Sequence, residues 1–133
     1  MGTYQEKLSI LSEMIAFARV DHSLKPSEYG FLLQVASGLG VDRESFERLL
    51  QQRPPKVILK SQGDRIVQFH RLVLLMNIDR EQHSKELDAL FNLGLKMGLP
   101  PAGMSRVLEV MDHYPDKLVP PEVLIDIFKA HYN

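Results

Sequence analysis

The sequence contains no cysteine and no tryptophan among its 133 residues. The lack of cysteine excludes disulfide bridges, thiolate zinc sites and cysteine nucleophiles, and a chain of this length does not need such cross-links to fold. The most apolar run, at 72–78, is far shorter than the roughly 20 residues that a membrane-spanning helix requires. The first residues also lack the basic and apolar segments of a secretory signal. We therefore expect a cytoplasmic protein without a membrane span.

The chain also lacks a strong excess of charge of one sign, because its net charge is −1. Nucleic-acid-binding proteins usually carry a basic face that offsets phosphate charge. One stretch does lean basic, but Phe46 is its only aromatic residue before Phe69, so platforms for stacking bases are lacking. We interpret this stretch as a solvated linker and helix surface, and we expect no nucleic-acid partner. Its basic residues are Arg43, Arg48, Arg53, Lys56, Lys60, Arg65 and Arg71.

Apolar residues recur at intervals of three and four along most of the chain, which predicts amphipathic helices. In the first such segment the repeating positions are Leu8, Leu11, Ile15 and Ala18. No segment shows the sustained alternation that is typical of strands. With 44% hydrophobic and 25% charged residues, the composition is that of one globular domain over residues 1–133. The sequence thus predicts an all-α fold of about seven helices.

The predicted helices are separated by prolines and glycines. The longest connection is "RPPKVILKSQG" at 53–63, where paired prolines restrict the backbone. Gly40 and Gly98 are suited to end the helices that precede them. We expect the last helix, at about 120–131, to close the core with its apolar face. That face comprises Val123, Leu124, Ile127 and Phe128.

The two halves of the chain resemble each other when one is shifted by 58 positions. The overlay needs no gap, and it keeps both terminating glycines and both apolar stripes in register. Its identical pairs are Asp21 and Asp79, Glu28 and Glu86, Leu32 and Leu90, Gly40 and Gly98, Arg48 and Arg106, and Leu50 and Leu108. We therefore predict a pseudo-twofold duplicated bundle, with repeats at about 6–52 and 64–112 and the final helix outside the repeat.

The segment "IAFARVDHSLKPSEYGFLLQVASGLGV" resembles the TerB-like tellurite-resistance family, and "LLMNIDREQHSKELDALFNLGLKMGL" repeats the same layout. Members of that family are similar in having an apolar helix, then Asp-Gly-x-aliphatic-x-x-x-Glu, then an amphipathic helix that ends in Leu-Gly. The resemblance covers about residues 8–111. It implies a cytoplasmic setting, or one peripheral to the inner membrane through a partner, in a stress response. It also implies an interaction module, like the related domain of DnaJ-like co-chaperones. The resemblance further implies that the acidic loop residues gather into a metal-binding patch.

The predicted metal ligands are one Asp and one Glu from each repeat. They are Asp21, Glu28, Asp79 and Glu86. Hard oxygen ligands suit calcium or magnesium, and the neighbouring His22 and His83 offer an alternative for zinc, although their spacing matches no helical His pair. The alternative is structural: the aspartates accept hydrogen bonds from backbone N–H groups without a partner at the helix junctions, and the glutamates stabilise the first turns of the following helices.

Two features of these loops argue against an ion site. An EF-hand is excluded because Ser23, Lys25 and Pro26 stand where its acids and glycine belong. His22 and Arg80 replace the glycine of the TerB-like pattern, and Arg80 adds a positive charge beside the acids.

No catalytic motif accompanies these loops: the sequence has no G-x-S-x-G elbow and no glycine-rich phosphate loop. The connection "HYPDKLVPPE", with Tyr114, is a candidate peptide contact or a plain connector. We therefore hold two hypotheses. The first is a non-enzymatic binding or scaffold domain that acts through contacts with a protein partner. The second is a divalent-metal sensor or metal-dependent domain. The sequence names no partner and sets no oligomeric state.

Overall fold

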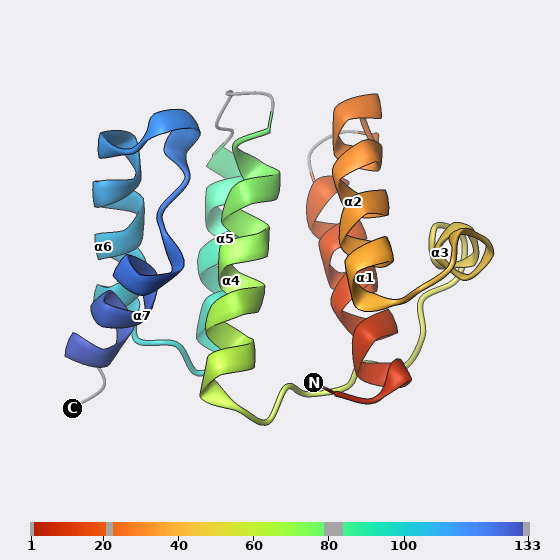
Figure 1. Ribbon diagram of the computed structural model, residues 1–133, viewed down its shortest axis with the longest axis horizontal. Coiled ribbons are helices and arrows are strands. Elements are labelled where there is room, and N and C mark those ends of the chain that lie inside the picture. Colours follow the sequence, from red (N-terminus) through yellow and green to blue (C-terminus); the bar gives the residue numbers. More distant parts are fainter. Residues whose placement is uncertain (1, 21–22, 79–83, 132–133) are drawn as a thin grey trace.

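The computed structural model describes residues 2–20, 23–78 and 84–131, and within them every regular element is helical (Figure 1). The seven α-helices are α1 Tyr4–Ala18, α2 Pro26–Leu39, α3 Arg43–Leu49, α4 Gln62–Met76, α5 Ser84–Lys96, α6 Pro101–Val110 and α7 Pro121–Ala130. Two short 3₁₀ turns, η1 Met111–His113 and η2 Pro115–Lys117, join α6 to α7. The all-α prediction with about seven helices is therefore confirmed.

The helices form three side-by-side layers (Figure 1). The hairpin of α1 and α2 lies against the hairpin of α4 and α5, mainly through α1 and α4. The pair α6 and α7 lies beyond the second hairpin, and α3 lies on the outer side of the first. The connection from α3 to α4 crosses the end of the bundle at which α1 and α4 begin.

Hydroxyl side chains set where α1 and α4 begin. The Thr3 hydroxyl accepts a hydrogen bond from the Glu6 N–H at 3.1 Å, and the Ser61 hydroxyl accepts one from the Asp64 N–H at 3.0 Å. Each satisfies an amide that the first helical turn leaves without a partner. Because Ser61 is the cap, α4 starts two residues earlier than the sequence predicts and includes Gly63 in its first turn.

Glycines end α2 and α5 in the same way. Gly40 and Gly98 have φ angles of 79° and 82°, in the left-handed region that favours glycine. The following residues then bond back into the helix: the Val41 N–H donates to the Ala36 carbonyl at 2.8 Å, and the Leu99 N–H to the Gly94 carbonyl at 3.0 Å. The predicted helix-ending role of both glycines is confirmed.

The helix bounds repeat along the chain. A shift of 58 converts residues 4–18 of α1 into residues 62–76 of α4, and the starts of α2 and α3, at 26 and 43, into those of α5 and α6, at 84 and 101. This is the shift that the sequence overlay predicts. The duplication itself stays a prediction.

The core lies between α1 and α4 and extends under α7. Its largest fully buried side chains include Leu11, Met14, Leu32, Phe46, Phe69, Leu72, Leu90, Met104 and Phe128. The Phe128 ring meets the Phe69 ring edge to face, with centroids 5.7 Å apart. The apolar face of α7 is thus packed on α4. None of the helices in the described residues is long and apolar enough to cross a membrane.

Candidate functional site

The predicted metal ligands divide into two described and two undescribed residues. Glu28 and Glu86 lie in the first turns of α2 and α5, and each is only 2% exposed. Both helices begin at the same end of the bundle (Figure 1). Asp21 and Asp79 lie outside the described residues.

Glu28 has a structural role in its own helix. Its Oε1 accepts a hydrogen bond from the Lys25 N–H at 2.9 Å, just before the first turn of α2. A carboxylate in this position satisfies a free amide and interacts favourably with the helix dipole. Within residues 2–20, 23–78 and 84–131, no three histidine, aspartate or glutamate side chains are placed to hold a metal ion. The metal site therefore stays a prediction.

A hollow lies elsewhere, between α1, α5 and the extended residues 53–59. We name residues 53–59 the strap and the hollow the strap groove. The groove consists of two adjoining cavities of about 380 and 530 Å³. The residues that line both cavities are Ser9, Glu13, Lys56 and Lys96.

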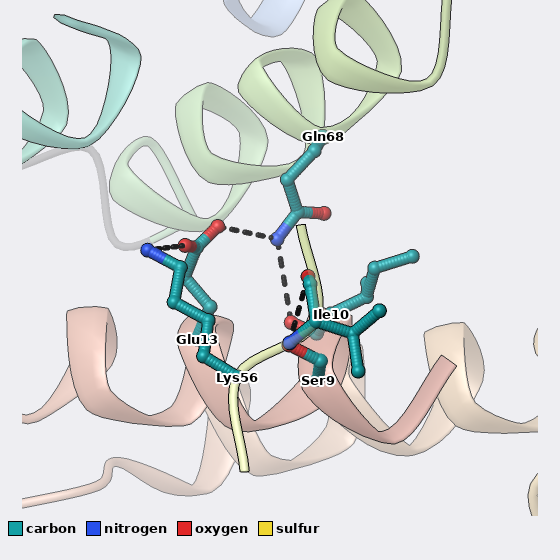
Figure 2. A network of polar contacts seen from close by, with 6 residues as sticks. Ser9, Ile10, Glu13, Lys56 and Gln68 are labelled. Atoms are coloured by element: carbon teal, nitrogen blue, oxygen red, sulfur yellow. Dashed lines mark hydrogen bonds and ion pairs between the residues drawn. The ribbon is translucent and has the colours of Figure 1, made fainter. Parts of the chain in front are cut away.

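Ser9 fixes the strap to α1. Its Oγ accepts a hydrogen bond from the Val57 N–H at 3.0 Å and lies 3.4 Å from the Val57 carbonyl oxygen, to which it donates (Figure 2). Pro54 and Pro55 have no N–H and restrict the backbone, so the strap forms no helix of its own. The hydroxyl thus replaces the backbone partner that regular structure would supply.

A buried amide continues this polar network towards α4. Gln68, on α4, donates from Nε2 to the Ile10 carbonyl at 3.3 Å and to Glu13 Oε1 at 3.0 Å (Figure 2). Arg71 Nη1 donates to Gln68 Oε1 at 3.2 Å, so both ends of the buried amide are hydrogen-bonded. Because an unpaired buried amide is costly, these bonds hold the wall of the groove in one arrangement.

Positive charge dominates the lining of the strap groove. Among the described residues, Arg53, Lys56, Arg65 and Lys96 line it, against the single acid Glu13. The carboxylate of Glu13 is already engaged, since its Oε2 lies 3.9 Å from Lys56 Nζ and its Oε1 accepts from the Gln68 amide.

Apolar side chains complete the lining. Ile58, on the strap, is 71% exposed, and Val20, at the end of α1, is 41% exposed. Leu93, on α5, and Met97, just past the end of that helix, are partly buried. A strongly exposed isoleucine beside a hollow leaves apolar surface that a partner can remove from water.

The hydroxyl that lines both cavities is engaged with the strap. Ser9 accepts a hydrogen bond from the Val57 N–H and donates one to the Val57 carbonyl, and no histidine stands among the described residues that line the groove. Those residues therefore do not form a nucleophile that a histidine activates.

The parts of this site lie far apart in the chain, so no local sequence pattern predicts it. By themselves Arg53, Lys56 and Arg65 indicate a solvated surface, and Lys96 belongs to the other half. A sequence signal was nevertheless present: Ile58 stands between lysines in a proline-led segment that predicts no helix.

The "HYPDKLVPPE" connection forms a second hollow of about 550 Å³. Its lining includes Phe31, Tyr114 and Leu118, and Leu118 is half exposed. Asp116 and Lys117 both have positive φ, at 55° and 59°, which is strained for residues with a side chain. Whether the connection is a peptide contact or a plain connector stays a prediction.

Comparisons of the chain with family models, with curated proteins and with solved structures find no match. The TerB-like resemblance therefore rests on the residues of the two loop-and-helix segments alone.

Proposed function

We propose that this chain is a non-enzymatic binding domain that acts through contacts with a protein partner, and that the strap groove is its contact site. The observation that carries the proposal is the exposed Ile58 on a strap that Ser9 holds in place, beside a cationic hollow. An exposed apolar residue on a fixed segment provides contact area that does not have to be ordered when a partner binds.

The resemblance to TerB-like proteins supports an interaction role in a stress response of the tellurite type, in the cytoplasm or at the membrane through a partner. We propose the duplicated architecture on two grounds. The helix bounds repeat with a shift of 58. The hydrogen bond from Gln68 to Ile10 also joins positions 58 apart, as expected for residues near a twofold axis.

Site-specific photocrosslinking in cells of the source organism tests the proposal. A photoreactive amino acid at position 58 should crosslink a protein, whereas the same group at Ile125 should not. Ile125 is a matched control because it is an exposed isoleucine, on α7 and outside the groove. Equal yields of crosslinked protein at both positions, or none at position 58, would show that the strap is not a contact site.

A further inference from the structure

The strap groove combines a fixed shape, surplus positive charge and exposed aliphatic surface, and together these features define what it can bind. We propose that it binds a short acidic segment of a partner protein in which acidic and aliphatic residues alternate. This inference rests on the proposed function and adds the chemistry of the ligand.

The charge of the lining selects an anionic ligand. Lys56 and Lys96 line both cavities, Arg53 lines the first and Arg65 the second. Arg65 is held in place by its Nε–H, which donates to the Leu59 carbonyl at 2.7 Å. In the described part of the lining, four cations face one carboxylate, which Lys56 and Gln68 already engage. The groove therefore attracts carboxylates and repels basic segments.

The length of the groove favours a peptide over a compact molecule. Its lining begins at Ser9 on α1 and ends at Val20, two residues past the end of that helix, which at 1.5 Å per helical residue is about 15 Å. An extended chain rises about 3.3 Å per residue, so about five residues fit. Successive side chains of such a segment point in opposite directions, so acidic residues can face the lysines while aliphatic ones contact Ile58 and Met97.

The lining also disfavours other polyanions. Phe17 is its only aromatic residue among those described, and that ring is buried, so it offers no platform for stacking bases. Binding to an anionic membrane surface would require a protruding apolar face. The cations of the groove surround a hollow instead. An acidic peptide satisfies both the charge and the shape.

Fluorescence anisotropy of labelled octapeptides tests the inference on the full chain. Three octapeptides alternate leucine with a second residue, which is glutamate, serine or lysine. We expect the Glu-Leu peptide to bind at least tenfold more tightly than the Ser-Leu peptide, and the Lys-Leu peptide not to bind. Raising the salt from 50 to 500 mM should weaken the binding of the Glu-Leu peptide at least fivefold, because ions screen exposed charges. Equal affinity for the Glu-Leu and Ser-Leu peptides, or preference for Lys-Leu, would overturn the inference.

Charge reversal locates the binding. Lys96→Glu should weaken the binding of the Glu-Leu peptide at least fivefold, whereas Lys129→Glu should leave that binding unchanged. The control is matched because both lysines are exposed and lie in the last turns of their helices, α5 and α7, so the dipole penalty is similar. Equal effects of the two substitutions would place the peptide outside the groove.

Two further probes decide between partner classes. Single-stranded oligouridine and vesicles with one-third phosphatidylglycerol should bind more weakly than the Glu-Leu peptide. If either binds more tightly and Lys96→Glu abolishes that binding, the groove is a nucleic-acid or membrane site and the inference is wrong.

Sequencing the partner segment that is crosslinked at position 58 separates this inference from the proposed function. A segment without acidic residues would contradict the inferred ligand chemistry but not the proposed binding of a protein partner.

Discussion

The helices α1 and α4 occupy equivalent places in the two halves, yet different elements lie against them. On α4 lies a helix, α7, whose Phe128 ring packs on Phe69. On α1 lies the strap, which Ser9 and Glu13 hold through polar contacts. A helix with an apolar face seals the surface that it covers, whereas an extended segment held at a few polar points leaves hollows beside it. The candidate binding site therefore lies where the bundle is closed by a strap.

The largest expected effect comes from breaking the apolar closure of α4. Phe128→Ala removes a fully buried ring and should lower the free energy of unfolding by about 3–5 kcal/mol. Chemical denaturation measures this loss. Ile125→Ala, on an exposed position of the same helix, should change stability by less than about 0.5 kcal/mol. Similar values for both variants would show that α7 does not close the core.

Deleting residues 120–133 extends this first test. The truncated chain should bind hydrophobic dyes and aggregate, because the side chains under α7 would face water. A truncated protein with an unchanged melting curve would contradict the role assigned to the last helix.

The predicted metal site requires both halves equally, because each supplies one Asp and one Glu. If Asp21, Glu28, Asp79 and Glu86 hold calcium, magnesium or zinc, an ion at 100 times its Kd should stabilise the fold by about 2.7 kcal/mol. The double variant Asp21→Asn, Asp79→Asn should lose the shift in melting temperature. A control with the same change of charge is Asp88→Asn with Asp126→Asn, at two exposed positions. Melting curves that calcium, magnesium, manganese and zinc all leave unmoved would rule out the metal hypothesis.

Matching substitutions at the helix-ending glycines test whether the halves are equivalent. Gly40→Ala and Gly98→Ala should each cost about 1–2 kcal/mol, because a side chain is strained at positive φ. Steric clashes should add little, since a Cβ at Gly40 meets nothing within 4 Å and one at Gly98 first meets Arg65 at 3.9 Å. Thermal unfolding of the two variants gives the comparison. Costs that differ several-fold would show that the halves are not equivalent at these ends.

Ser9 has no counterpart that acts in the same way in the second half. Ser9→Ala should lower stability by about 1 kcal/mol, because the Val57 N–H loses its partner. Hydrogen exchange should also become faster at Val57. The equivalent position on α4 is Val67, which is 42% exposed, so Val67→Ala should have almost no effect. An unchanged exchange rate at Val57 in Ser9→Ala would show that the hydroxyl does not hold the strap.

The smallest expected effect concerns His70, which lies on α4 near the segment that leads to α7. Burial, with a contribution from the nearby Arg71 charge, lowers the pKa of His70 below its ordinary 6.5, while a backbone hydrogen bond with Val119 opposes the shift. The unfolded chain therefore takes up the proton at higher pH than the folded one, so acidification below about pH 6.5 favours unfolding.

His70→Gln should therefore lose less stability than the unsubstituted protein between pH 7.5 and pH 5.5. Denaturation midpoints at the two pH values measure the difference. The comparison variant is His113→Gln, at an exposed histidine in η1. If the two variants behave alike, His70 does not contribute to the pH dependence.

Much of the fold follows from local patterns. The apolar spacing and the glycines at 40 and 98 predict the helices and two of their ends, because these features act within one or two turns. Gly63 predicts a later start for α4 than the structure has, because the Ser61 cap starts the helix before that glycine. The candidate metal residues follow from the repeat, but only Glu28 and Glu86 lie within the described residues.

By itself the sequence determined that the protein is all helical and set the spacing of its helices, because caps and apolar periodicity are decided by near neighbours. Only the tertiary structure places Lys56 and Lys96 in the lining of the same groove and Ser9 within hydrogen-bond distance of Val57 on the strap. Such pairs lie about 40 or more positions apart, and no local pattern encodes them. They meet because α1 and α4 bury their apolar faces against each other, and that packing places the strap and α5 beside α1.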